Sequence, residues 1–151
     1  MSDIPEKLQD LLETFAIIED RQERIQLLID MAEGFRPVPE SIAKSPFPEE
    51  ARVPACESEA FVFTETQPNN TLRYHFAVEN PQGISAMATA VIIDKTCSGA
   101  PPEKIVNVPA DVIYDIFGRE LSMGKNMGLT NMLNMCKVEA AKCIARHSSS
   151  G

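Results

Sequence analysis

The chain has 151 residues, which suits one compact domain, and its 44% hydrophobic and 24% charged residues exclude a wholly disordered protein. Its 22 Asp and Glu outnumber 14 Lys and Arg, so the formal net charge of −8 has the wrong sign for a nucleic-acid backbone. No apolar run approaches the ~18 residues of a membrane span, and residues 1–6 lack the basic flank and apolar stretch of a signal peptide. We therefore expect a cytoplasmic protein with no nucleic-acid or membrane partner.

The first 35 residues predict a helical hairpin. Apolar residues recur at helical spacing from Ile4 to Phe15, with Asp3 as a candidate N-cap. A second helix is predicted to start at Asp20, in a sequence that resembles a capping box, and to stop at Gly34. Its expected buried face consists of Ile25, Leu28, Ile29 and Ala32.

A proline-rich segment separates this hairpin from a region of strand character. Five prolines between positions 37 and 54 exclude a long helix or a paired strand, so we expect an extended connector there. Strand-forming residues follow at 60–64 and 72–78, with turn residues at 67–70 between them. This pattern predicts an antiparallel β-hairpin.

The rest of the chain is predicted to be helical. The expected helices lie at about 84–94, 101–107, 110–117 and 126–146. Residues 147–151 are expected to be a disordered tail, which leaves residues 1–146 as a single domain. The order of elements predicts an α+β fold, with a small antiparallel β-sheet packed against helices.

The four cysteines, Cys56, Cys97, Cys136 and Cys143, include no C-x-x-C pair, and the chain has only two histidines. The sequence therefore shows no metal-binding motif. Cys136 and Cys143 lie on one face of the last predicted helix with about 10 Å of rise between them, too far apart for a disulfide. We interpret them as core residues. Cys56 stands apart because it follows a proline-terminated loop and directly precedes a strand, where a side chain can project from a rigid support.

Nucleophilic catalysis by a cysteine requires a histidine base. His75, on the second predicted strand, is the one plausible candidate. A thiol hydrolase therefore stays open as an interpretation, on the condition that His75 reaches Cys56.

Residues 53–59, VPACESE, resemble the signature of the SufE family, the sulfur-acceptor proteins of iron–sulfur cluster assembly. That signature is a small residue, the acceptor cysteine, one variable residue and a serine at the entry to the first strand. Residues 124–129, GKNMGL, resemble the family's S-R-x-x-G-L at the start of the final helix, and residues 105–107 fit as well. The order of elements agrees over about residues 5–145, and the resemblance implies a SufE/NifU-like fold.

The chain departs from the family pattern near the cysteine. Ala55 stands where the family usually has glycine, and Glu57 and Glu59 stand where it usually has glutamine. Lys125 replaces the arginine that precedes the final helix. We expect Lys125 to lie close to the Cys56 loop, and Glu57 and Glu59 to project to the same side of a strand.

The resemblance implies a sulfur relay. Cys56 would take persulfide sulfur from a cysteine desulfurase, a pyridoxal-phosphate enzyme, and pass it to an iron–sulfur cluster scaffold, stimulating the desulfurase. The exchange itself needs neither a metal nor a cofactor on this chain. The alternative is a non-catalytic adaptor or regulator that docks on a desulfurase without carrying sulfur. The residues expected to support Cys56 or to bind partners are Arg52, Ala55, Glu57, Ser58, Glu59, Lys125 and Gly128.

Overall fold

The computed structural model describes residues 3–150, without the side chains of residues 149 and 150. In chain order the elements are α1 (Glu6–Ala16), α2 (Arg21–Glu33), the 3₁₀ turn η1 (Glu49–Ala51), β1 (Ala60–Thr66), β2 (Leu72–Val78), α3 (Ile84–Cys97), α4 (Pro102–Ile105), α5 (Val112–Phe117) and α6 (Met123–Ser150). The predicted α+β class, with a small antiparallel sheet packed against helices, is confirmed.

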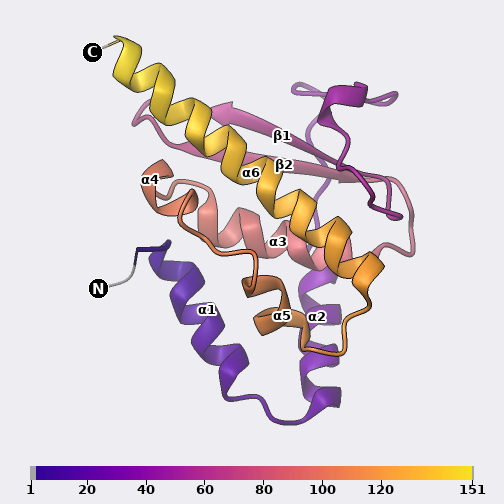
Figure 1. Ribbon diagram of the computed structural model, residues 1–151. Helices are drawn as coiled ribbons and strands as arrows, with labels where there is room; N and C mark the ends of the chain where they lie inside the picture. The colour runs from indigo at the N-terminus through magenta and orange to yellow at the C-terminus, as the bar shows by residue number, and fades with distance from the viewer. Residues whose placement is uncertain (1–2, 151) are drawn as a thin grey trace.

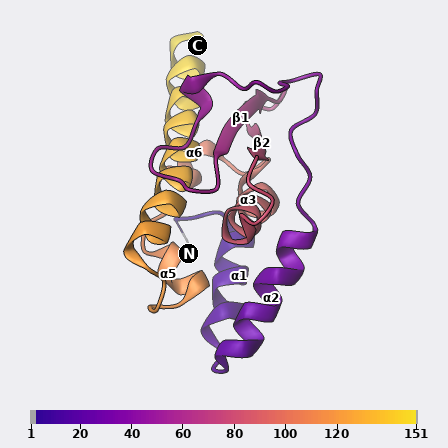
Figure 2. The same ribbon diagram turned by 90° about the vertical axis from the view of Figure 1, so that its right-hand side faces the viewer.

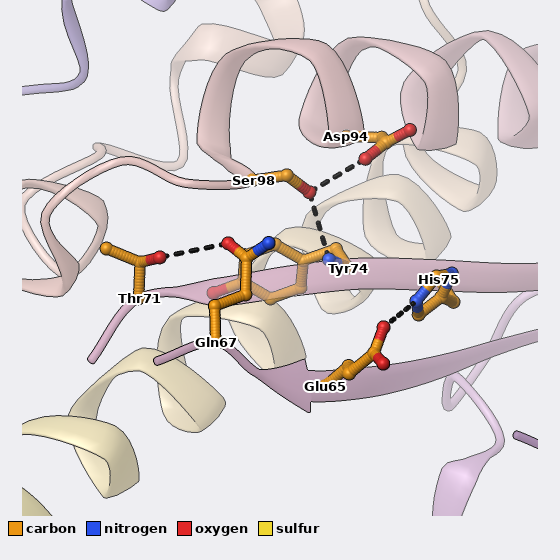
Figure 3. Close-up of polar contacts among 7 residues, drawn as sticks. All are labelled: Glu65, Gln67, Thr71, Tyr74, His75, Asp94 and Ser98. Atoms are coloured by element: carbon orange, nitrogen blue, oxygen red, sulfur yellow. Dashed lines mark hydrogen bonds and ion pairs between the residues drawn. The ribbon is translucent and has the colours of Figure 1, made fainter. Parts of the chain in front are cut away.

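The sheet is a two-stranded antiparallel hairpin whose register runs from Ala60 opposite Val78 to Thr66 opposite Leu72. The free edge of β2 is covered by the end of α3. Ser98 makes this contact, because its hydroxyl accepts a hydrogen bond from the Tyr74 backbone N–H at 2.9 Å and donates one to Asp94 at 2.7 Å (Figure 3). Covering an exposed strand edge in this way blocks further pairing with another chain.

Helices α3 and α6 pack against one face of the sheet (Figure 1). Alternate residues of the strands, including Val62, Tyr74 and Phe76, point into this core, as the two-residue period of a strand requires. The opposite side of α3 packs against α1, α2 and α5 in a second core (Figure 2). Helix α3 is therefore buried on both sides, which explains its nearly uniform apolar sequence.

The proline-rich connector is a structural layer over the other face of the sheet. The Phe47 ring lies 5.1 Å from the Phe61 ring and 5.5 Å from the Phe63 ring, between centroids. The Val38 backbone N–H also donates to the Phe76 carbonyl at 2.8 Å. The connector thus buries apolar strand residues that would otherwise face water.

Two details of the predicted helical hairpin are wrong, and a third is confirmed. Helix α1 is capped by Pro5 and not by Asp3, because the Pro5 carbonyl already accepts the first helical hydrogen bonds. Asp20 caps α2 as predicted, and its carboxylate accepts from the Gln22 N–H at 2.9 Å. Ile25 and Ile29 are not buried, with 37% and 36% of their surface exposed, because α2 packs through Leu28 and Ala32, with Leu27 and Met31 beside them.

Helix α6 is longer than its predicted span at both ends. It begins three residues earlier, at Met123, and continues to Ser150 past the predicted end near Arg146. Residues 147–150 therefore extend the helix instead of forming a disordered tail, since no proline or glycine lies between Gly128 and Gly151, and Gly151 lies outside the described residues. No helix in the described part of the chain combines the length and apolar character that crossing a bilayer needs.

Candidate functional site

The candidate site is built on the Cys56 loop, residues 53–59, which leads from η1 into β1. Two backbone hydrogen bonds shape it: the Val53 N–H donates to the Ala60 carbonyl at 2.8 Å, and the Glu59 N–H donates to the Cys56 carbonyl at 3.2 Å. The Cys56 side chain is half-buried, whereas the other three cysteines are buried. Cys56 is thus the cysteine most available to another molecule.

One side of the Cys56 loop packs directly on α6. A Cβ atom at Gly128 would lie 3.2 Å from the Ala55 carbonyl oxygen and 3.2 Å from the Cys56 Cα, so only glycine leaves the loop its full room. One turn further along, the Asn131 side-chain N–H donates to the Pro54 carbonyl at 2.7 Å. Helix α6 therefore supports the loop through one close backbone approach and one hydrogen bond.

The other side of the loop packs on the start of α3. A Cβ atom at Gly83 would lie 2.8 Å from the Ser58 Cβ, well inside van der Waals contact. The Asn80 N–H also donates to the Ser58 carbonyl at 3.1 Å. Cys56 is therefore held between the N-terminal ends of α3 and α6, which come from opposite sides of the loop.

Two residues of the loop have left-handed backbone conformations. Ala55 has φ +56° and Glu59 has φ +53°. This left-handed conformation is energetically unfavourable for residues with a Cβ atom, whereas glycine adopts it without a steric penalty. The prediction that Glu57 and Glu59 project to one side of a strand is wrong, because the strand begins only at Ala60 and residues 57–58 form a turn. Both glutamates are exposed nonetheless.

A cavity of about 70 Å³ opens beside Cys56. Its lining residues are Cys56, Glu57, Ser58, Gln82, Gly83, Ile84, Ser85, Gly124, Lys125, Gly128 and Leu129. Pockets that enclose a small-molecule substrate usually measure about 300–1,000 Å³, so this one suits a group no larger than a side-chain tip or a few atoms. Lys125 is exposed at this cavity although 69 residues separate it from Cys56.

The structure gathers most of the predicted site residues and leaves two outside. The cavity brings together Cys56, Glu57, Ser58, Lys125 and Gly128, while Ala55 contributes backbone to the loop beside it. Arg52 instead lies on the sheet, with its guanidinium carbon 5.1 Å from the Phe61 ring centre and its Nε 3.4 Å from a Glu49 carboxylate oxygen. Glu59 does not line the cavity.

His75 does not lie in the Cys56 site. Its Nε2 lies 3.1 Å from a carboxylate oxygen of Glu65 across the β-hairpin (Figure 3). The His75 side chain lines a different cavity from the one beside Cys56. His147 lies 19 residues beyond Gly128 on α6, which is about 28 Å along a helix. The condition for a thiol hydrolase, a histidine within reach of Cys56, is therefore not met in the described part of the chain.

The other cysteines belong to the core. Burial raises the pKa of Cys97 to about 11 and raises the pKa of Cys136 as well. The Tyr74 hydroxyl donates to the Cys136 carbonyl at 2.8 Å and joins β2 to α6. The raised pKa values keep the Cys97 and Cys136 thiols protonated at neutral pH, so these two are poor nucleophiles. Residues 3–150 also contain no group of three or more histidine, cysteine or carboxylate side chains placed to hold a metal ion.

Sequence reasoning missed two residues that shape the site, Gly83 and Asn131. Gly83 lies just after a turn-forming Asn-Pro pair, so the sequence suggests only that it belongs to a turn. Its close approach to Ser58 is visible only in the structure. Asn131 lies 77 residues from its partner Pro54, and no local pattern indicates that pairing.

Comparison with known proteins gives a family and a fold for the chain. A family model described as "SufE: Fe-S metabolism associated domain" matches residues 9–140. Among solved structures, the solution structure of a hypothetical protein from Thermus thermophilus is similar, with a TM-score of 0.70 and 23% identity over 94% of this chain and 98% of that one. This second likeness shows the fold alone. No curated protein gives a match.

Proposed function

This chain belongs to the SufE family, whose domain is associated with Fe–S metabolism, and on that premise we propose that Cys56 accepts sulfur from a cysteine desulfurase and passes it to an iron–sulfur cluster scaffold. The observation that carries the proposal is the position of Cys56. It is the one cysteine of the four that is not buried, and it lies on a supported loop beside a cavity too small for an organic substrate. Four free thiols also suit a reducing compartment, so we place the reaction in the cytoplasm.

The transfer is an exchange between sulfur atoms. Cys56 loses its proton, and its thiolate attacks the terminal sulfur of a persulfide on the desulfurase cysteine. A new S–S bond forms on Cys56 while the old S–S bond breaks, and the desulfurase cysteine leaves as a thiolate. A nucleophile on the scaffold then attacks the terminal sulfur in the same way, and Cys56 is restored. The pyridoxal phosphate belongs to the desulfurase, and the exchange calls for no cofactor on this chain.

The surroundings of Cys56 suit a group that carries negative charge. Lys125 and the N-terminal turns of α3 and α6 border the cavity, and both the ammonium and the positive ends of the helix dipoles favour an anion there. The exposed Glu57 carboxylate, which also lines the cavity, opposes them. A persulfide is such an anion, and its outer sulfur atom fits a space of this size. Protein docking must supply the alignment of the sulfur atoms, because the cavity has no room for a separate substrate.

Mass spectrometry after incubation with a cysteine desulfurase and free cysteine tests the proposal. We expect one or more sulfur atoms added at Cys56, none in Cys56→Ser, and unimpaired loading in Cys143→Ala, the control that removes a buried thiol. Full sulfur loading of Cys56→Ser would overturn the assignment. Desulfurase stimulation that persists in Cys56→Ser, without sulfur on the wild type, would establish the adaptor instead. Turnover of an ester or amide without any desulfurase would establish a hydrolase.

A further inference from the structure

We propose that Asn131 is a positioning residue for Cys56, and that its hydrogen bond to Pro54 holds the Cys56 loop against α6 and limits the exposure of the thiol. The bond is short, at 2.7 Å, and it joins parts of the chain that lie 77 residues apart. Its direction is unambiguous, because a carbonyl oxygen only accepts and the amide N–H must face it. Asn131 has no part in the exchange between sulfur atoms.

The Asn131 bond opposes a strain within the loop. Ala55, between Pro54 and Cys56, has φ +56°, which an alanine adopts only when its surroundings hold it there. The energetic cost of such a conformation is comparable with the net contribution of one hydrogen bond. Loss of the bond should therefore let Ala55 relax toward negative φ, and the backbone on either side of it should move.

The attachments beyond Cys56 determine which part of the loop moves. Ser58 is fixed by its contact with Gly83 and by the hydrogen bond from Asn80, neither of which involves α6. On the α6 side, Gly128 offers close packing but no hydrogen bond to the loop. The Asn131 bond is thus the polar attachment of residues 54–56 to α6, and its loss should release the Cys56 side of the loop from the helix.

Alkylation of Cys56 by iodoacetamide, followed by peptide mass spectrometry, measures this release in the free protein. We expect the Cys56 rate to rise about 2–10-fold in Asn131→Ala and Asn131→Asp, the range that follows from the loss of one hydrogen bond. The Asp variant keeps the size of the side chain and removes the donor. Asn134→Ala is the matched control, because Asn134 is exposed on the same helix and should leave the rate unchanged.

The pH dependence of Asn131→Asp separates positioning from general loosening. The introduced carboxyl can donate a hydrogen bond to the Pro54 carbonyl only while it is protonated. The reaction rate of Cys56 in Asn131→Asp should therefore rise above that of the wild type as the pH rises through about 4. A dithiodipyridine reagent, which reacts with thiols in acid, gives the profile. Wild-type rates in both variants would overturn the proposal. Faster alkylation of Cys97, Cys136 and Cys143 together with Cys56 would also overturn it, because that result indicates global opening.

The consequence for sulfur transfer rests on the proposed function, and the alkylation measurements do not. If the wild type accepts sulfur, Asn131→Ala should accept it faster by about the same factor. An unchanged loading rate despite faster alkylation would overturn the role of Asn131 in transfer. Absence of sulfur on the wild type would count against the proposed function and leave the alkylation result to decide on Asn131.

Discussion

Gly128 lies directly against Cys56, and a Cβ at position 128 would come within 3.2 Å of the Cys56 Cα and 3.4 Å of its Cβ. The first of these distances is tighter than an ordinary contact of a Cβ atom, and it is to backbone that cannot easily move aside, so the Cys56 loop fits against α6 best where the helix has no side chain. Gly124, one turn earlier on the same helix, has no atom within 4 Å of its would-be Cβ. Substitutions at Gly128 and Gly124 therefore form a matched test of the contact between α6 and the Cys56 loop.

Replacing Gly128 with alanine should displace the Cys56 loop, whereas Gly124→Ala should not. Both changes gain up to ~1 kcal/mol of helix propensity, but the methyl group at position 128 also pushes on Ala55 and Cys56. We expect Gly124→Ala to raise the free energy of unfolding by more than Gly128→Ala does. We expect faster alkylation of Cys56 in Gly128→Ala alone. Equal stability and equal alkylation in the two variants would show that the contact has no effect.

Ala55→Gly should stabilise the protein. Ala55 has a positive φ, and glycine adopts that conformation without a steric penalty. After subtraction of the extra entropy of glycine in the unfolded chain, we expect a gain of about 0.5–1 kcal/mol in the free energy of unfolding from urea titrations. Ala110→Gly is the control, because Ala110 is exposed in a loop and is not among the positive-φ residues of the described chain. That change should destabilise the protein.

The secondary structure was largely predictable because its signals are local. Asp20 indicates the start of α2, and the alternation of apolar residues locates β1 and β2 within two residues. The exposure of Ile25 and Ile29 was not predictable in the same way. Helical periodicity shows which residues share a face, but how much of that face is covered depends on the rest of the fold.

The candidate site was predictable in part. Cys56 was identified from its place between a proline-rich segment and a strand, which is local information. The orientation of Glu59 depends on a left-handed backbone that no glycine signals, so the prediction that Glu57 and Glu59 follow strand geometry is wrong. The pairing of Asn131 with Pro54 depends on how α6 crosses the loop, and only the tertiary structure reveals it.

Stability should fall in mildly alkaline solution because of Cys97. Burial raises its pKa from 9.0 to about 11 in the folded protein. Below pH 9 both states keep the proton and the thiol makes no difference. Above pH 9 the unfolded chain loses the proton first, so the free energy of unfolding decreases until about pH 11, by at most about 1.4 kcal/mol per pH unit for this group.

Urea titrations at several pH values between 7 and 10.5 measure how steeply the free energy of unfolding falls with pH. Cys136 and Tyr74 contribute with the same sign, because burial raises their pKa values as well. Cys97→Ala should lower stability at every pH through the cavity it creates, and it should also make the alkaline decline shallower. A decline with the same slope in Cys97→Ala and wild type would contradict this assignment.

Glu57 and Glu59 should differ in their effect on sulfur transfer, although both are exposed and only two residues apart. Glu57 lines the Cys56 cavity and Glu59 does not. A partner that reaches Cys56 must therefore approach the Glu57 carboxylate closely, and a lysine or arginine there would attract it across the interface. Such attraction acts mainly on the rate of association and is weakened by salt.

We expect Glu57→Gln to slow sulfur transfer from the cognate desulfurase a few-fold at low ionic strength, with a difference that shrinks toward 1 M salt, where the screening length is about 3 Å. Glu59→Gln makes the same change of charge outside the cavity and should have a smaller effect. Sulfur-transfer rates of both variants and the wild type, measured as a function of salt concentration, test whether Glu57 has this larger effect. If the two variants respond alike, the negative charge of the loop acts at long range and the cavity position of Glu57 has no special role. If neither responds, both glutamates lie outside the docking surface, and the partner must orient on the apolar and cationic residues that border Cys56, among which Ile84 and Lys125 are the exposed ones.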